Sequence, residues 1–257
     1  MKKRLLIVSL FRSLLSVVVA IGTVAVASAQ LLYEETFPFV AGDSSAFNNV
    51  GWTVITPPSG YNGNFAYDIT NAATGQPISG NPVYMGSGSI GAGMFYTTNG
   101  AGTGPNGTSE FTSIDPSANP GLTFSIYANL QGTGGSSTYF AVEVGGAWYA
   151  SSTAMAPPTS TDHYYDLRTL SYDAGAASWN TLAVTDTSVT IGGVASGDLA
   201  GPITGVGIVQ SVPGSFNAWN FADYAVTIVP EPTSVALLSI GALFLVAFGR
   251  FRPASRS

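Results

Sequence analysis

The sequence contains no cysteine and has little charge. Without cysteine a disulfide framework and thiolate catalysis are excluded, and a zinc site is left with His163 and carboxylates as its only ligands. Charged residues make up 9% of the 257 residues, whereas 46% are hydrophobic and 31 are glycine. A chain of this length buries enough apolar surface to fold without crosslinks. The composition therefore favours short strands joined by turns over salt-bridged helices.

Positive charge is almost absent from the middle of the chain. Between Gln30 and Val229, thirteen Asp and Glu residues stand against one cation, Arg168, which gives a net charge near −12. Such a surface repels a phosphate backbone at long range. We therefore expect no nucleic-acid partner.

The N-terminus has the pattern of a secretory signal peptide. Met1 is followed by three basic residues, and a largely apolar run from Leu5 leads to Ala27-Ser28-Ala29. A basic start, a short hydrophobic stretch and an A-x-A site are what the export machinery and signal peptidase recognise. We expect residues 1–29 to be removed, leaving Gln30 as the mature N-terminus. The alternative is an uncleaved membrane anchor.

The last 29 residues, 229–257, combine three features in a fixed order. Pro230-Glu231-Pro232 comes first, an uncharged apolar run over 235–249 follows, and the chain ends in a basic cluster made of Arg250, Arg252 and Arg256. This combination resembles the PEP-CTERM sorting signal of exported bacterial proteins. The alternative is an ordinary tail anchor, which would use the same apolar run without recognition of Pro230-Glu231-Pro232.

The resemblance implies a route to the cell surface. A helix of 15 residues spans about 22 Å, less than a bilayer core of about 30 Å, and its basic end stays on the cytoplasmic side. In this family an exosortase, a membrane protease, is thought to recognise the Pro-Glu-Pro motif. The resemblance implies an intermediate anchored in the inner membrane, then a cell-surface or extracellular protein associated with extracellular polysaccharide.

The segment between the two ends has the alternation of β-strands. Leu122, Phe124 and Ile126 fall on one face of a strand, and a second strand repeats this pattern with Phe140, Val142 and Val144. Ten or more short strands with no regular repeat favour a two-sheet β-sandwich, a jelly roll, over a β-helix. We predict an all-β fold over 30–228, flanked by the signal helix and the C-terminal hydrophobic helix.

Both ends of this β domain also resemble concanavalin-like and carbohydrate-module ectodomains. The residues that carry this resemblance are Glu34-Glu35-Thr36-Phe37 and Gly51-Trp52 near the start, and 220–226 near the end. If the first and last strands pair, Glu35 and Asp223 approach each other and form a candidate structural Ca²⁺ site, since carboxylate oxygens suit this ion. The alternative is that both are exposed surface acids.

The sequence offers no catalytic motif. The Glu-x-Asp-x-x-Glu pattern of concanavalin-like glycosidases is absent, and His163 has no marked nucleophile beside it, so we expect a surface histidine and no enzyme. Aromatic rings can instead stack on sugars. The candidates are Trp52, Trp148, Tyr149, Trp179 and Trp219, for which the alternative is a place in the core.

Three functional classes therefore stay open. A non-catalytic envelope or matrix protein ranks first, a carbohydrate-binding module is the alternative, and a glycoside hydrolase comes third.

Overall fold

The computed structural model describes nine stretches of the chain: 29–37, 51–55, 60–64, 68–79, 82–87, 91–100, 111–132, 136–212 and 217–229. Residues Gln30–Ile228 form one compact unit. The signal peptide and the sorting segment predicted from the sequence lie outside the described residues, as do both flanking helices. Within the described stretches, no helix has the length and apolar character needed to span a bilayer.

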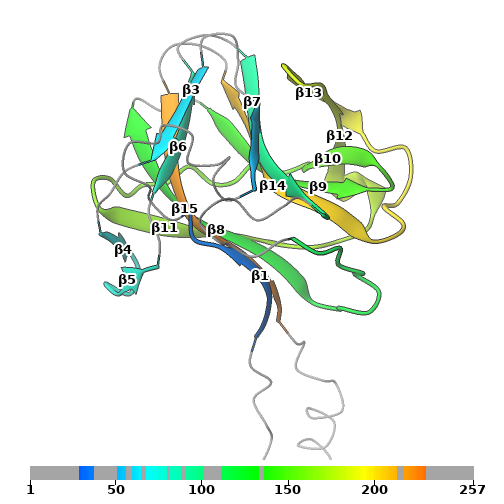
Figure 1. The fold of residues 1–257 in the computed structure, drawn as a ribbon, viewed down its shortest axis with the longest axis horizontal. Coiled ribbons are helices and arrows are strands. Elements are labelled where there is room, and N and C mark those ends of the chain that lie inside the picture. Colours follow the sequence, from blue (N-terminus) through cyan, green and yellow to red (C-terminus); the bar gives the residue numbers. More distant parts are fainter. Residues whose placement is uncertain are drawn as a thin grey trace, which may run out of the picture. The chain divides into compact units, whose positions relative to one another are not determined.

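Eight strands form the first sheet, in the order β3-β6-β15-β8-β11-β4-β5, with β1 also paired to β15 (Figure 1). Their bounds are β1 Gln30–Glu35, β3 Gly60–Asn64, β4 Ile69–Asn71, β5 Pro77–Ile78, β6 Val83–Ser87, β8 Leu122–Gly132, β11 Tyr164–Ser171 and β15 Asn217–Ile228. All pairs are antiparallel except β11 with β4. The first and last strands of the domain therefore pair, which is the condition on which the predicted calcium site depends.

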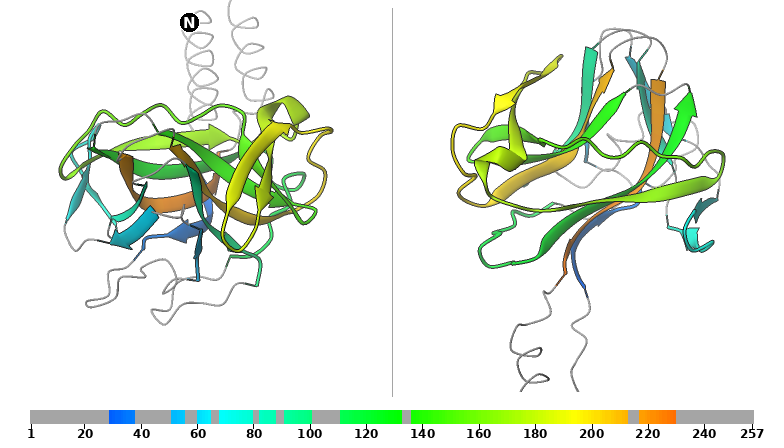
Figure 2. Two further views of the ribbon diagram at one scale, coloured as in Figure 1. Left: turned by 90° about the horizontal axis from the view of Figure 1, so that it is seen from above. Right: turned by 180° about the vertical axis from the view of Figure 1, so that it is seen from behind.

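Seven strands form the second sheet, in the order β13-β12-β10-β9-β14-β7-β2. Their bounds are β2 Thr53–Ile55, β7 Gly91–Thr98, β9 Ser137–Val144, β10 Ala147–Ser151, β12 Trp179–Val184, β13 Val189–Val194 and β14 Ile203–Val212. The single short helix in the described residues is the 3₁₀ turn η2, Ala176–Ser178. Two further views show the sheets as two layers (Figure 2). The prediction of an all-β, two-sheet sandwich is confirmed.

The main core lies between the two sheets and contains the residues that alternation predicted. Leu122, Phe124 and Ile126 from β8 are at most 2% exposed, and Phe140, Val142 and Val144 from β9 are at most 4% exposed. They belong to one cluster with rings from β1, β7 and β15. Burial of these apolar surfaces provides the main stabilisation, because the described residues contain no crosslink and one ion pair.

The second sheet is strongly curled, and the side that faces into the curl carries an apolar cluster of its own. β13 and β7 are separated by four strands in the sheet order, yet they lie close together and rise opposite each other in Figure 1. We call the side that faces into this curl the concave face. Its buried members are Ile55, Met94, Ala141, Ala150, Leu182, Val189 and Val209, and its partly buried members are Ala92, Tyr96, Tyr139, Trp148, Val184 and Ile191.

The one ion pair in the described residues holds a loop against the first sheet. The Arg168 guanidinium donates to the carbonyl oxygens of Ala156 and Pro157 and lies 3.1 Å from Asp166. Asp166 in turn accepts from the backbone N–H groups of Thr159 and Ser160. Burial raises the pKa of Asp166, but these hydrogen bonds and the Arg168 charge outweigh it, so the pKa lies below its usual value. This pair fixes residues 156–160 rather than forming a reactive centre.

Candidate functional site

Three of the five aromatic rings proposed for sugar stacking are core residues. Trp52, Trp179 and Trp219 are each 1% exposed. Trp52 Nε1 donates to the Tyr33 hydroxyl at 2.9 Å, and Trp179 Nε1 donates to the Asp173 carbonyl at 2.6 Å. A ring enclosed on both faces cannot stack on a sugar. These three tryptophans therefore take the alternative role of core packing.

The remaining two candidates are neighbours on β10 and point to opposite sides of the sheet. Tyr149 packs against the main core between the sheets, whereas Trp148 lies on the concave face and is partly exposed. This follows from the period of two along a strand. Of the five candidates, Trp148 is the one whose ring is available on the concave face.

Trp148 lies over a gap left by a glycine. In the register of the sheet Trp148 pairs with Glu143 of β9, and Glu143 pairs with Gly205 of β14. A Cβ at position 205 would lie 2.8 Å from Trp148 Cη2, so only glycine leaves room for the indole to extend across Glu143. The ring ends beside Tyr96 of β7, with the ring centroids 5.0 Å apart and the planes at 65°. This edge-to-face geometry is a favoured aromatic arrangement and fixes the indole in place.

Tyr96 and Tyr139 complete the aromatic residues of the concave face. Both are partly buried, and they come from β7 and β9, on either side of β14. Sequence reasoning missed both of them. Along β7, Met94 and Tyr96 alternate with Phe95 and Thr97, so both sides of the strand carry a large apolar or aromatic residue and the local pattern marks neither as a surface. Only the folded sheet shows that these rings share one face with Trp148.

One carboxylate stands among these rings. Glu143 is partly exposed, and its Oε2 accepts a hydrogen bond from Thr204 Oγ1 at 2.8 Å. No other Asp or Glu, and no Lys, Arg or His, occurs in any strand of the seven-stranded sheet. A fixed acceptor beside a partly exposed indole suits the hydroxyl groups and the apolar face of a sugar ring.

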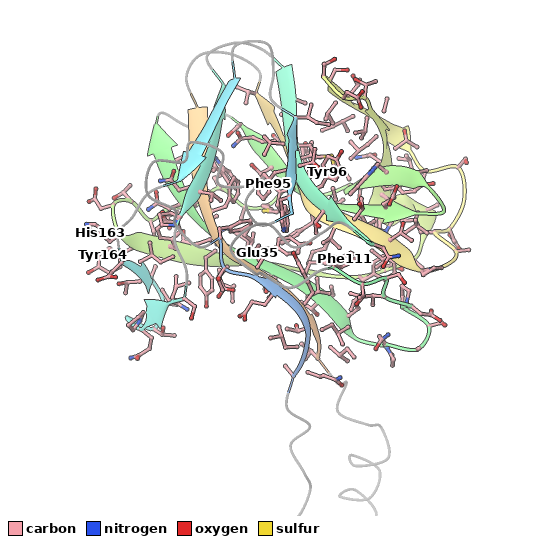
Figure 3. All side chains as sticks on the ribbon, viewed as in Figure 1. Glu35, Phe95, Tyr96, Phe111, His163 and Tyr164 are labelled. Carbon is pink, nitrogen blue, oxygen red and sulfur yellow. The ribbon has the colours of Figure 1, made fainter. Side chains whose placement is uncertain are left out.

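Of the two residues proposed for calcium, Glu35 ends β1 and Asp223 lies in the middle of β15. Glu35 is fully buried, its Oε1 accepts from the Phe37 N–H at 2.8 Å, and its register partner is Tyr224 (Figure 3). Asp223 lies in an irregularity of β15 with a left-handed φ of 51° and hydrogen-bonds to Glu34. Burial, followed by the charge of Glu34 and this hydrogen bond, raises the pKa of Asp223 to about 7.

This arrangement supplies few of the oxygens that calcium needs. Ca²⁺ takes six to eight oxygen ligands, and among the residues described here no three His, Asp or Glu side chains converge on one point. Asp223 and Glu34 instead share a hydrogen bond that favours a protonated carboxyl. Calcium at Glu35 and Asp223 stays a prediction.

His163 and Tyr164 lie at the start of β11, far from Tyr96 (Figure 3). The backbone N–H of Thr70 donates to the carbonyl oxygen of His163 at 2.8 Å, which joins the turn to β4. Both side chains are exposed, Tyr164 by 55%. Tyr164 is therefore a large, exposed aromatic ring on the other sheet.

A cavity of about 580 Å³ lies between the loops at 115–121, 172–174 and 199–202. The two carboxylates that line it, Asp115 and Asp173, hydrogen-bond to residues close to them in the chain. Asp115 accepts from the hydroxyl and N–H of Ser117, and Asp173 accepts from Gly175 N–H and the Ser178 hydroxyl. These hydrogen bonds hold the pKa of each acid below its usual value. The two acids shape the loops, and neither is raised toward the pKa of a general acid.

Comparisons with known proteins give likenesses of architecture at low identity. No family model matches the chain, and no curated protein matches it. Among solved structures, an exo-β-agarase matches at a TM-score of 0.45 and 11% identity, over 79% of this chain and 25% of the agarase. The chain thus matches about a quarter of that enzyme.

Two carbohydrate-binding modules are covered almost completely. The family 11 module from Clostridium thermocellum matches at a TM-score of 0.43 and 12% identity, over 77% of this chain and 94% of the module. The CBM22-1 xylan-binding domain from Paenibacillus barcinonensis Xyn10C matches at a TM-score of 0.37 and 10% identity, over 79% and 97%. At TM-scores below 0.5 these likenesses assign neither a site nor a ligand.

Proposed function

We propose that residues 30–228 form a non-catalytic carbohydrate-binding domain that binds polysaccharide through the concave face of the seven-stranded sheet. The observation that carries this proposal is the position of Trp148. Its partly exposed indole is held over Gly205 and against Tyr96, with the Glu143 carboxylate beside it. A rigid ring with an adjacent hydrogen-bond acceptor matches a sugar, which has an apolar face and a rim of hydroxyl groups.

The same face argues for binding without hydrolysis. Glycoside hydrolases of the usual kind place two carboxylates across the scissile bond, about 5–10 Å apart. Glu143 is the sole carboxylate in any strand of this sheet, so the strands supply no second acid as its partner. An acid without such a partner can accept hydrogen bonds from a glycan but cannot complete this mechanism.

The ends of the sequence support an exported protein. The pattern over 1–29 supports removal of a signal peptide before Gln30, and the pattern over 229–257 supports sorting at Pro230-Glu231-Pro232 with the apolar run as a membrane intermediate. Display at the cell surface would bring the concave face into contact with extracellular polysaccharide. The domain would then be an envelope protein whose ligand is extracellular polysaccharide.

Affinity electrophoresis of the full-length protein in gels containing soluble polysaccharides tests the binding. Trp148→Ala should lower the affinity for a retained polysaccharide by about tenfold to a hundredfold, because truncating a central aromatic anchor costs about 2 kcal/mol or more. Tyr164→Ala is the matched control, since it removes an exposed ring from the other sheet. Equal retention of the wild type and Trp148→Ala, or loss of binding with Tyr164→Ala alone, would contradict the proposed face.

A further inference from the structure

The concave face also indicates what charge its ligand carries. Glu143 is paired across the strands with Trp148 on one side and Gly205 on the other, so its carboxylate lies beside the indole. Thr204 Oγ1 donates to Oε2 at 2.8 Å, and no described residue donates to Oε1. One carboxylate oxygen is therefore available to a ligand that lies on the Trp148 ring.

No cation balances this carboxylate. The strands of the seven-stranded sheet contain no Lys, Arg or His. Arg168 is the sole lysine or arginine between residues 30 and 229, and it belongs to the other sheet, where Asp166 and three carbonyl oxygens engage its guanidinium. With thirteen acids over the same stretch, the field around the domain repels anionic glycans and attracts cationic ones.

We propose that the concave face binds a polysaccharide that bears free amino groups, such as a partly deacetylated aminosugar polymer. The sugar ring stacks on Trp148, and its ammonium group lies between the indole and Glu143. An ammonium ion is attracted by the face of an indole and, more strongly, by a carboxylate within hydrogen-bond distance. This inference rests on the proposed function and specifies its ligand class.

Isothermal titration calorimetry with three hexasaccharides tests the inference: a glucosamine oligomer, its fully N-acetylated counterpart and cellohexaose. The full-length protein is titrated at about pH 6, between the ordinary pKa values of carboxyl and amino groups, and at about 0.15 M salt. The glucosamine oligomer should bind at least tenfold more tightly than the other two. The difference should shrink when the salt is raised, because partly exposed charge pairs are screened.

Glu143→Gln keeps the shape and the Thr204 contact of the side chain but removes its charge. We expect this variant to bind the glucosamine oligomer about tenfold more weakly and the two neutral oligomers as the wild type does. Asp68→Asn is the charge-matched control, because Asp68 is an exposed acid next to β4 in the other sheet. It should leave all three affinities unchanged, which separates a local contact from general attraction to a polycation.

The outcomes separate this inference from the function on which it rests. If the neutral oligomers bind as tightly as the glucosamine oligomer and Trp148→Ala abolishes their binding, the carbohydrate-binding function stands and the amino-glycan inference is wrong. The inference is also wrong if Glu143→Gln and Asp68→Asn weaken binding equally. If no oligomer binds with any dependence on Trp148, the proposed function itself fails. Melting temperatures of all variants confirm that they are folded.

Discussion

Asp223 should make the stability of this domain fall as the pH rises toward neutrality. Its folded-state pKa is raised from 3.8 to about 7, first by burial and then by the charge of Glu34 and the hydrogen bond to it. A raised carboxyl pKa means that the fold favours the protonated form. The stabilisation is therefore complete below about pH 4 and is lost as the pH rises through about 7. Asp223→Asn removes this ionisation while keeping a residue that tolerates the left-handed φ of 51°.

The size of the effect follows from the shift. A change from 3.8 to about 7 corresponds to about 4 kcal/mol at 1.36 kcal/mol per pKa unit. Asp223 is only partly buried, and solvent screening at such a position reduces the effective value to about 1–2 kcal/mol. At pH 8 Asp223→Asn should therefore be more stable than the wild type by this amount, with a melting temperature several degrees higher. At pH 4 the two proteins should be nearly equal.

Urea unfolding followed by tryptophan fluorescence between about pH 4 and 8 measures the difference. The buried Trp52, Trp179 and Trp219 report the loss of the core. Asp68→Asn, at an exposed acid outside this pair, should follow the wild-type curve throughout. Parallel curves for the wild type and Asp223→Asn over the whole range would refute the argument, because the native protein would then bind no extra proton at this site.

Further predictions concern packing, the loop clamp and sorting. Gly207→Ala should lower the free energy of unfolding by about 1–3 kcal/mol, because the added Cβ would lie 2.4 Å from a backbone oxygen of β7. Gly197→Ala is the control, since the space around Gly197 is open, and it should have no comparable effect in the same urea assay. Arg168→Met should lower the free energy of unfolding by about 1–3 kcal/mol, because it leaves partly buried acceptors without their charged donor. Limited proteolysis of this variant should show faster cleavage within 153–161. Glu231→Ala should leave unprocessed protein in the cytoplasmic membrane of the native host. Fractionation and immunoblotting check this, and equal surface yield for the wild type and the variant would remove Glu231 from the sorting motif.

Alternation along single strands predicted the main core because the sandwich buries one face of β8 and one face of β9 there. Phe124 and Phe140 illustrate this: each follows a period of two, and their rings meet across the layers at 6.2 Å. The pairing of the first and last strands was likewise supposed from the sequence and is observed. These features depend on local pattern and on the general rules of two-layer folds.

The candidate site depended on tertiary features that no local pattern contains. Trp52, Trp148 and Trp179 look alike in sequence, but Trp52 and Trp179 belong to the core between the sheets, whereas Trp148 lies on the concave face and is partly exposed. The room for that ring comes from Gly205, which is 57 residues away in the chain. Asp223 lies where the pairing of β15 with β8 is irregular, between residues 222 and 225, and its φ is left-handed at 51°. Local alternation cannot locate such an irregularity.

The position of β15 has a mechanical consequence for a domain held by its C-terminal end. β15 pairs with β8 along its length, and its other edge is paired first with β6 and then with β1, up to Ile228. Hydrogen bonds in an antiparallel ladder run perpendicular to the strands. A pull on Val229 along the strand axis therefore loads many of these bonds together in shear instead of opening them one after another. A chain tethered at this point would resist tension through its longest and most completely paired strand.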